Sequence, residues 1–120
     1  MPGKICGSSG RIGSRVAVRC QAFGMTVIAY DPYIGEEVAD RIHVRLVSDL
    51  DELLRTADFI TVHTPLTEET RGMVGAKEIA RMKEGVRLIN CARGGIMDEA
   101  ALLEGLTAGK IAGLGIDVYS

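Results

Sequence analysis

The sequence KICGSSGRIGSRVAVRCQAFGMTVIAYD, residues 4–31, decides the fold. It begins with a short apolar stretch, Lys4 to Gly7, and ends with TVIAY (26–30), which is nearly all apolar. Between them, residues 11–23 carry apolar side chains at the spacing of an amphipathic helix, and Gly24 is a typical C-terminal helix residue. A strand, a helix and a second strand covered on both faces form the repeating unit of a parallel sheet.

The rest of the chain repeats this alternation. Further strands are predicted at 44–47 (an edge strand), 59–62, 86–89 and 111–118. Further helices are predicted at 35–41, at 49–56 with Ser48 as N-cap, at 77–82, and from the N-cap Asp98 to Leu106. We expect Ala100, Leu103 and Leu106 to form the inward stripe of the last helix, because they recur at helical spacing.

Alternating strands and helices predict an α/β fold with a doubly wound parallel sheet of the Rossmann type. The expected architecture has three αβα layers and strand order 3-2-1-4-5-6. The sequence shows no internal repeat or interdomain linker, so residues 1–120 form one predicted domain. Because no helix follows the last predicted strand, we expect this domain to be part of a larger protein.

Composition and charge exclude several classes of protein. Hydrophobic residues make up 47% of the chain and the formal net charge is -2, which gives no electrostatic case for binding nucleic acid or an anionic membrane. No apolar run approaches the roughly 18 residues of a spanning helix, and the amino terminus does not resemble a signal peptide. The 3 cysteines, Cys6, Cys20 and Cys91, are widely spaced and predict neither disulfides nor a zinc site but a reducing compartment, the cytoplasm. His43 and His63 are too isolated to suggest any metal site.

A glycine-rich turn, Gly7-Ser8-Ser9-Gly10-Arg11-Ile12-Gly13, separates the first strand from the first helix. Glycines here let backbone amides at the helix N-terminus approach a pyrophosphate. Ser8 breaks the strict G-x-G-x-x-G pattern, whereas G-x-x-G-x-x-G is intact and resembles the spacing of short-chain dehydrogenases and epimerases. The turn alone is therefore weak evidence for a dinucleotide.

Asp31 strengthens that interpretation. It follows the strand TVIAY and lies eighteen residues after Gly13, where an acidic side chain can accept hydrogen bonds from an adenosine ribose. Its charge would repel a 2′-phosphate, so NAD is expected rather than NADP. An Asp-Pro turn with no ligand is the alternative reading of Asp31-Pro32.

A second turn, Ile89-Asn90-Cys91-Ala92-Arg93-Gly94-Gly95, presents one arginine after a buried strand. Open α/β sheets bind ligands at the carboxyl ends of their strands. The planar guanidinium of Arg93 suits a carboxylate or a polarised carbonyl oxygen. A surface arginine on a glycine turn is the alternative. Cys91 is not expected to act as a nucleophile, because no histidine is placed beside it by the sequence.

Four blocks carry a family resemblance: AFGMTVIAYDPYI (22–34), ADFITVHTPLTEETRGMV (57–74), INCARGGIMDEAALLEGL (89–106) and GKIAGLGIDVYS (109–120). In these blocks the chain resembles the D-isomer-specific 2-hydroxyacid dehydrogenases, and among them the phosphoglycerate dehydrogenases of serine biosynthesis. The resemblance implies the nucleotide-binding domain of an NAD-dependent oxidoreductase, which would commonly be a homodimer joined through this domain and act on a 2-hydroxy or 2-keto acid.

The resemblance also implies roles for individual residues. Arg93 matches the catalytic arginine, which binds the substrate carboxylate and stabilises oxyanion character on the reacting oxygen. Asp117 matches the residue that orients the nicotinamide carboxamide. The cofactor-binding positions match Gly10, Arg11, Ile12, Gly13, Asp31, Pro32, Tyr33, His63, Thr64, Pro65, Thr70, Cys91, Ala92 and Asp117.

Two departures from the family pattern limit the expected activity. The catalytic glutamate and histidine of the family, and its substrate domain, match no part of residues 1–120, so we expect this chain alone to be inactive or nearly so. The first strand is short and its turn contains Ser8 and Ser9, which predicts reduced NAD affinity. A truncated or engineered amino terminus, or an epimerase-like loop, would each give this pattern.

Two other functions compete with an NAD-binding domain. A non-catalytic scaffold or regulatory module is favoured by the broken glycine pattern and opposed by Asp31 and Arg93. An epimerase-like enzyme rests on residues 7–13 alone, and the chain has no Tyr-x-x-x-Lys pair.

Overall fold

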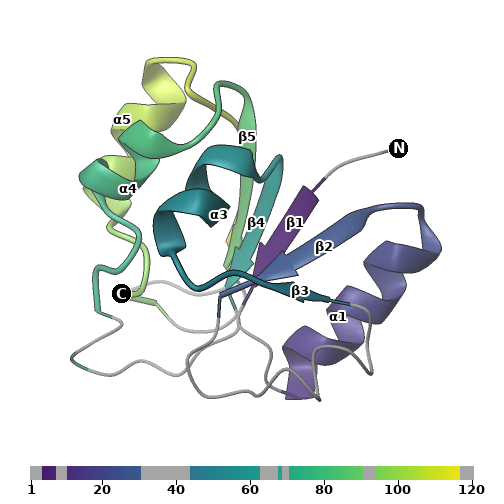
Figure 1. Ribbon diagram of the computed structural model, residues 1–120. Coiled ribbons are helices and arrows are strands. Elements are labelled where there is room, and N and C mark those ends of the chain that lie inside the picture. The colour runs from purple at the N-terminus through teal and green to yellow at the C-terminus, as the bar shows by residue number, and fades with distance from the viewer. Residues whose placement is uncertain are drawn as a thin grey trace.

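The structure is a computed structural model that describes residues 4–7, 11–30, 44–62, 68, 71–90 and 94–116. Within these ranges one parallel sheet contains β1 (Lys4–Gly7), β2 (Thr26–Ala29), β3 (Arg45–Leu46), β4 (Phe59–Val62), β5 (Val86–Asn90) and β6 (Ile111–Ile116). The helices are α1 (Arg11–Ala22), α3 (Leu50–Thr56), α4 (Ala76–Arg81) and α5 (Glu99–Thr107) (Figure 1). The helix predicted at 35–41 lies outside the described residues.

The sheet has the order β3-β2-β1-β4-β5-β6, which matches the order expected from the sequence. The chain passes from β1 outward to β3, then crosses to β4 and proceeds outward to β6. The short strand β3 lies at one edge, as predicted for residues 44–47. The doubly wound α/β fold is confirmed.

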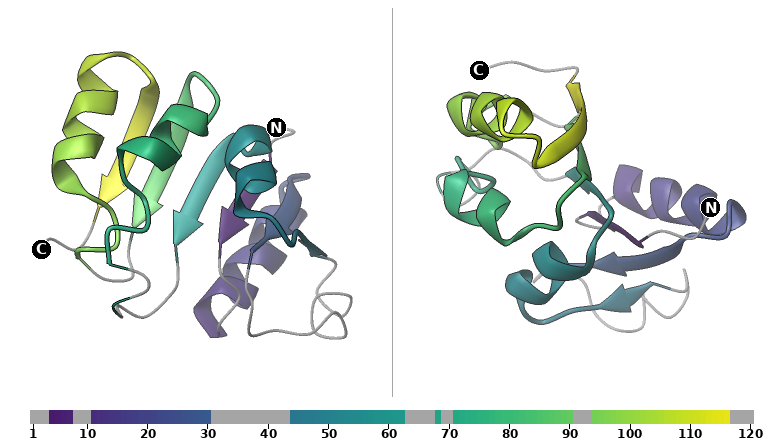
Figure 2. Two further views of the ribbon diagram at one scale, coloured as in Figure 1. Left: turned by 60° about the vertical axis from the view of Figure 1, so that its left-hand side comes forward. Right: turned by 90° about the horizontal axis from the view of Figure 1, so that it is seen from above.

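Helices cover the sheet from both sides. Seen from above, α1 lies on one face, and α3, α4 and α5 lie together on the other (Figure 2). The helices α3 and α5 each contact α4, while α1 contacts β1 and β2. The result is the expected three-layer αβα arrangement.

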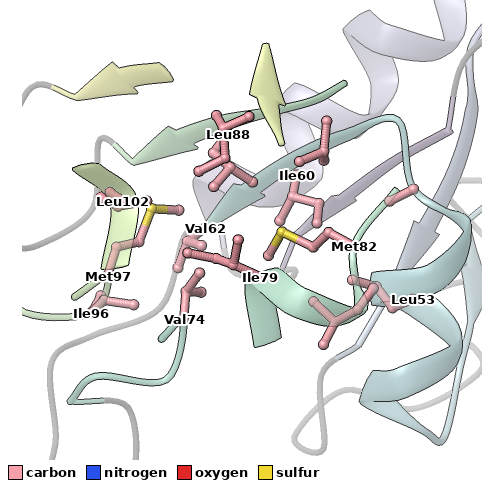
Figure 3. Packing of buried hydrophobic residues seen from close by; sticks show 14 of the residues in the cluster. Leu53, Ile60, Val62, Val74, Ile79, Met82, Leu88, Ile96, Met97 and Leu102 are labelled. Atoms are coloured by element: carbon pink, nitrogen blue, oxygen red, sulfur yellow. The ribbon is translucent and has the colours of Figure 1, made fainter. Parts of the chain in front are cut away.

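The larger of the two described cores lies between the sheet and helices α3 to α5 (Figure 3). Residues from two strands, a helix and a loop meet there with almost no exposed surface, including Ile28, Leu53, Leu88 and Ile96. On the α1 face, the described core residues Val27, Ala29 and Val44 pack with half-buried neighbours such as Phe59. Alternate residues of β2 and of β4 therefore face different cores, as the two-residue period of a strand requires.

A glycine terminates helix α1, as predicted. Gly24 has φ +81°, and its N–H donates to the Gln21 carbonyl at 2.9 Å while Met25 N–H donates to Cys20 at 3.1 Å. This pair of bonds is a Schellman motif, which needs a left-handed residue after the helix. The helix stops one residue earlier than predicted, and Phe23 is exposed rather than part of its apolar face.

Two predictions about helices were wrong. The N-cap of α3 is Asp49 rather than Ser48, since the Asp49 carboxylate accepts the Asp51 N–H at 3.0 Å. Helix α5 begins after the predicted cap Asp98, but its buried residues are Ala101, Leu102 and Gly105, and the predicted stripe of Ala100, Leu103 and Leu106 faces outward. Both sides of this helix are apolar, so helical spacing alone could not identify the buried one.

Candidate functional site

The strand order reverses between β1 and β4, which are neighbours at the centre of the sheet. In open α/β sheets the chain connections run in opposite directions from such a point, which leaves a crevice at the carboxyl ends of the two strands. Open α/β sheets bind ligands in this crevice. The topology therefore places the candidate site at the carboxyl edge of the sheet, near β1 and β4.

The N-terminus of α1 lies at this edge. Helix α1 starts at Arg11, and only residues 8–10 separate it from β1. Its first turn, which includes the predicted residues Arg11, Ile12 and Gly13, contains no acidic side chain. Its backbone N–H groups lack helical partners and carry the positive end of the helix dipole, so this end of α1 suits an anion such as a pyrophosphate. Gly10 lies outside the described residues.

Strand β2 ends at the same edge of the sheet, beside β1. Ala29, the last residue of β2, is in register with Gly7, the last residue of β1. Asp31 follows two residues later in the sequence, so the predicted ribose acceptor comes soon after a strand that ends next to the glycine-rich turn. Asp31, Pro32 and Tyr33 themselves lie outside the described residues.

Three further strands end level with one another. In the parallel ladders, Val62 is in register with Asn90, and Asn90 with Ile116. Each is the last residue of its strand, and adjacent strands lie about 4.8 Å apart. The next residues in the chain are His63, Cys91 and Asp117, so three segments with predicted site residues leave the sheet at one level. The predicted residues of these segments, His63, Thr64, Pro65, Thr70, Cys91, Ala92, Arg93 and Asp117, lie outside the described residues.

The turn that follows Arg93 has the expected backbone. Gly95 has φ +89°, a left-handed conformation that glycine adopts without strain. Its carbonyl accepts the Gly72 N–H at 2.7 Å, which joins the turn to the segment after residue 70. The chain thus bends two residues after the predicted catalytic arginine, as its sequence indicated.

Two buried polar residues near the carboxyl ends of their strands are not among the predicted site residues. Asn90 is 2% exposed and Thr61 is 5% exposed, and both have interaction partners. Buried polar side chains are stable only when they are hydrogen-bonded. The position of Asn90, at the end of an apolar strand and immediately before the arginine turn, could have indicated a residue near the site. Its residue type alone does not reveal that it is buried.

The described residues give no support for a reactive cysteine, a metal site or a membrane-spanning helix. Burial raises the pKa of the half-buried Cys20 thiol, which lies in the last turns of α1, at the end of the helix opposite Arg11. No group of histidine, cysteine, aspartate and glutamate residues in the described part of the chain could hold a metal ion. Among the same residues, no helix is long and apolar enough to cross a membrane.

Comparison with known proteins agrees with the geometry. The family model of the D-isomer specific 2-hydroxyacid dehydrogenase, NAD binding domain, matches residues 5–120. The chain is 57% identical over 110 residues to D-3-phosphoglycerate dehydrogenase of Bacillus subtilis, and 53% identical over 110 residues to that of Methanocaldococcus jannaschii. Each match covers 92% of this chain and 21% of the relative, so the chain spans about a fifth of the length of these proteins.

A solved structure shows the same fold. D-lactate dehydrogenase from Aquifex aeolicus, complexed with NAD and lactic acid, superimposes with a TM-score of 0.91 at 43% sequence identity. The match covers 98% of this chain and 35% of that one. The topology, the α1 N-terminus and the family match lead to one conclusion: the chain belongs to the D-isomer specific 2-hydroxyacid dehydrogenase family and is its NAD-binding domain.

Proposed function

We propose that this chain is the NAD-binding part of an oxidoreductase of the D-3-phosphoglycerate dehydrogenase type, which interconverts a 2-hydroxy acid and a 2-keto acid in serine biosynthesis. The common level at which Val62, Asn90 and Ile116 end their strands carries this proposal, because it brings three predicted site segments to one edge. The identity of 57% to a D-3-phosphoglycerate dehydrogenase favours a phosphorylated hydroxy acid over lactate or glyoxylate.

In the proposed site, residues that follow β1 and β2 bind the adenosine and pyrophosphate, and residues that follow β5 and β6 bind the substrate and nicotinamide. Backbone N–H groups at Arg11 and Ile12 bind the pyrophosphate, and the Asp31 carboxylate accepts hydrogen bonds from the ribose. Bound NAD supplies the hydride acceptor. Arg93 binds the substrate carboxylate and stabilises negative charge on the reacting oxygen, while Asp117 holds the nicotinamide carboxamide. The remaining predicted residues, Gly10, Gly13, Pro32, Tyr33, His63, Thr64, Pro65, Thr70, Cys91 and Ala92, line the cofactor.

Catalysis requires more than these residues. Hydride transfer needs a general acid or base within hydrogen-bond reach of the reacting oxygen. The family's glutamate and histidine have no counterpart among the predicted site residues of this chain. We propose that residues 1–120 form one domain of a larger two-domain enzyme and show little or no turnover alone. A robust turnover of 3-phosphoglycerate by the 120-residue chain would overturn this part of the proposal.

NADH titration of the chain, followed by cofactor fluorescence, tests the binding site. We expect saturable NADH binding, weaker binding of NADPH, and a loss of NADH affinity of at least about tenfold in Asp31→Ala, because a hydrogen bond to a charged acceptor is removed. Glu84→Ala is the control: it removes the same charge from an exposed side chain in the α4–β5 turn, at the opposite edge of the sheet. Equal NADH affinity in Asp31→Ala and the wild type would contradict the assigned role.

A non-catalytic scaffold or regulatory module remains the second candidate, because Ser8 interrupts the strict glycine pattern. The central position of β1, paired with β2 and β4, shows that this short strand still forms. Folded protein that binds no NADH at millimolar concentration would favour the scaffold.

The assembly and compartment are also proposals. Family resemblance suggests a homodimer, and the odd number of separated cysteines suggests the reducing cytoplasm. Sedimentation of the chain at micromolar concentration tests the dimer.

A further inference from the structure

A short main-chain ladder joins two loops that are far apart in the sequence. Val74 and Met97 form a parallel β-bridge outside the main sheet. Three hydrogen bonds support it: Gly72 N–H to the Gly95 carbonyl (2.7 Å), Val74 N–H to Ile96 (3.1 Å) and Asp98 N–H to Val74 (2.9 Å). We call residues 72–74 and 95–98, joined in this way, the clamp.

The side chains of the clamp are anchored in the main core. Val74 is 5% exposed, Ile96 0% and Met97 2%. Figure 3 shows these three side chains close together beside Leu102 of α5. Because close-packed interiors resist displacement, these buried side chains restrict movement of the clamp backbone.

The clamp is also fixed along the chain by the starts of two helices. Gly75 follows it directly, is the N-cap of α4, and donates its N–H to the Glu78 carboxylate at 2.9 Å. Asp98 is the N-cap of α5 and accepts the Ala100 N–H at 3.1 Å. Since α4 contacts α5, the two strands of the clamp lead into packed, capped helices.

The other ends of the two loops are fixed by the sheet. Val62 ends β4, and nine residues separate it from Gly72, where the chain enters the clamp. Asn90 ends β5 in register with Val62, and four residues separate it from Gly95. The first loop contains His63, Thr64, Pro65 and Thr70, and the second contains Cys91, Ala92 and Arg93. Each of the two loops therefore begins at the end of a sheet strand and ends at the clamp.

We propose that the clamp sets the relative position of these two loops, and that Gly72 is a positioning residue for the NAD and substrate site. Gly72 has φ +66° and its N–H forms the shortest of the three clamp bonds. A side chain at this position strains the left-handed backbone, and rotation of the peptide group that relieves the strain moves the N–H away from Gly95. The inference rests on the proposed function, because the two loops carry its predicted residues.

The chain provides a matched control in Gly85. Gly85 has φ +83°, its N–H donates to the Lys110 carbonyl at 2.9 Å, and a Cβ there would meet nothing within 4 Å, as at Gly72. It precedes β5, at the amino edge of the sheet. Gly72→Ala and Gly85→Ala thus each place a side chain on a left-handed backbone whose N–H donates a main-chain hydrogen bond, and we expect both variants to lose stability.

Two measurements on the 120-residue chain test the proposal. In amide NMR spectra without cofactor, Gly72→Ala shifts the resonances of residues 91–94 and speeds hydrogen exchange of Asp98 N–H, while Gly85→Ala leaves both unchanged. In NADH titrations, Gly72→Ala weakens binding about fivefold or more, as expected if the strain is transmitted to the site, and Gly85→Ala does not.

The outcomes separate this inference from the proposed function. Unchanged resonances of residues 91–94 in Gly72→Ala overturn the clamp, whether or not NADH binds. Shifted resonances with unchanged NADH affinity, or equal weakening by both variants, overturn the positioning role of Gly72. A wild-type chain that binds no NADH contradicts the proposed function, and the NMR comparison then still decides whether the clamp holds the loops.

Discussion

The two faces of β5 are packed very differently. On the face toward helices α3 to α5, Val86 and Leu88 are almost fully buried and belong to the main core. On the other face, Arg87 is exposed and Ile89 is half-buried. The neighbouring strand β6 follows the same division, since Leu114 packs against the main core while Gly113 lies beside Arg87.

This difference shows where the stability of the β5–β6 half of the sheet originates. Of the described helices, α1 is the one on the second face, and it contacts β1 and β2. Burial of apolar area stabilises by about 25 cal/mol per Å² and is concentrated on the α3–α5 face. Neighbouring residues of one strand should therefore differ strongly in their contribution to the free energy of unfolding.

The largest expected effect compares two adjacent residues of β5. Leu88→Ala should reduce the free energy of unfolding by about 3 to 4 kcal/mol, because it leaves a cavity in a closely packed core. Ile89→Ala should reduce it by only about 1 kcal/mol, because part of that side chain is already exposed. Urea unfolding followed by circular dichroism measures both. Equal losses would show that the second face contributes as much as the first.

Effects of intermediate size are expected for two glycines, one on each side of the sheet. A Cβ on Gly105 of α5 would lie 2.6 Å from Ile111 Cδ1 and 3.0 Å from Cγ1, so Gly105→Ala should destabilise by about 1 to 2 kcal/mol despite its better helix propensity. A Cβ on Gly113 would come no closer than 3.5 Å to Arg87, so Gly113→Ala should stabilise slightly, by about 0.5 kcal/mol. Thermal melting of the two variants in parallel measures whether their stabilities change in opposite directions. A destabilised Gly113→Ala would contradict the expectation that the second face has room for an added methyl group.

The smallest effect concerns Arg87 itself. Its guanidinium carbon lies 5.5 Å from the centre of the Phe59 ring, on the second face. At an exposed site such a cation–π contact contributes about 0.5 kcal/mol, so Arg87→Ala should be barely destabilising and Arg87→Lys less so. Urea midpoints of these variants, compared with that of Leu88→Ala, measure the difference. A loss above about 2 kcal/mol for Arg87→Ala would mean that this face is as tightly packed as the other.

Much of the fold could be predicted from local patterns. The apolar strands at 26–30, 59–62 and 86–89 were found because short apolar runs between turn residues have few alternative structures. Capping by Asp98 and the end of α1 at Gly24 were found because each depends on one residue and its near neighbours. Ser48 was mistaken for the cap of α3 because Ser48 and Asp49 are both good N-cap residues, and only the backbone shows which one accepts the N–H.

The candidate site was predicted in a different way. The residue types of Asp31 and Arg93, and their positions after predicted strands, indicated a ligand at the carboxyl edge, and the sheet order is consistent with this. The clamp could not be predicted from the sequence, because its hydrogen bonds join main-chain groups more than twenty residues apart, and a glycine at position 72 does not reveal which segment it pairs with.

The order of strands and helices and the helix caps at Asp98 and Gly24 follow from the amino-acid sequence alone, because hydrophobic period and turn chemistry act over a few residues. The family also follows from the sequence, through the resemblance of its four blocks and the family match over residues 5–120. Which side of α5 enters the core, which face of β5 carries the stability, and how residues 72–74 join residues 95–98 were decided only in the tertiary structure. These features depend on which elements approach one another, and contact between distant segments is set by packing of the whole chain rather than by local preference.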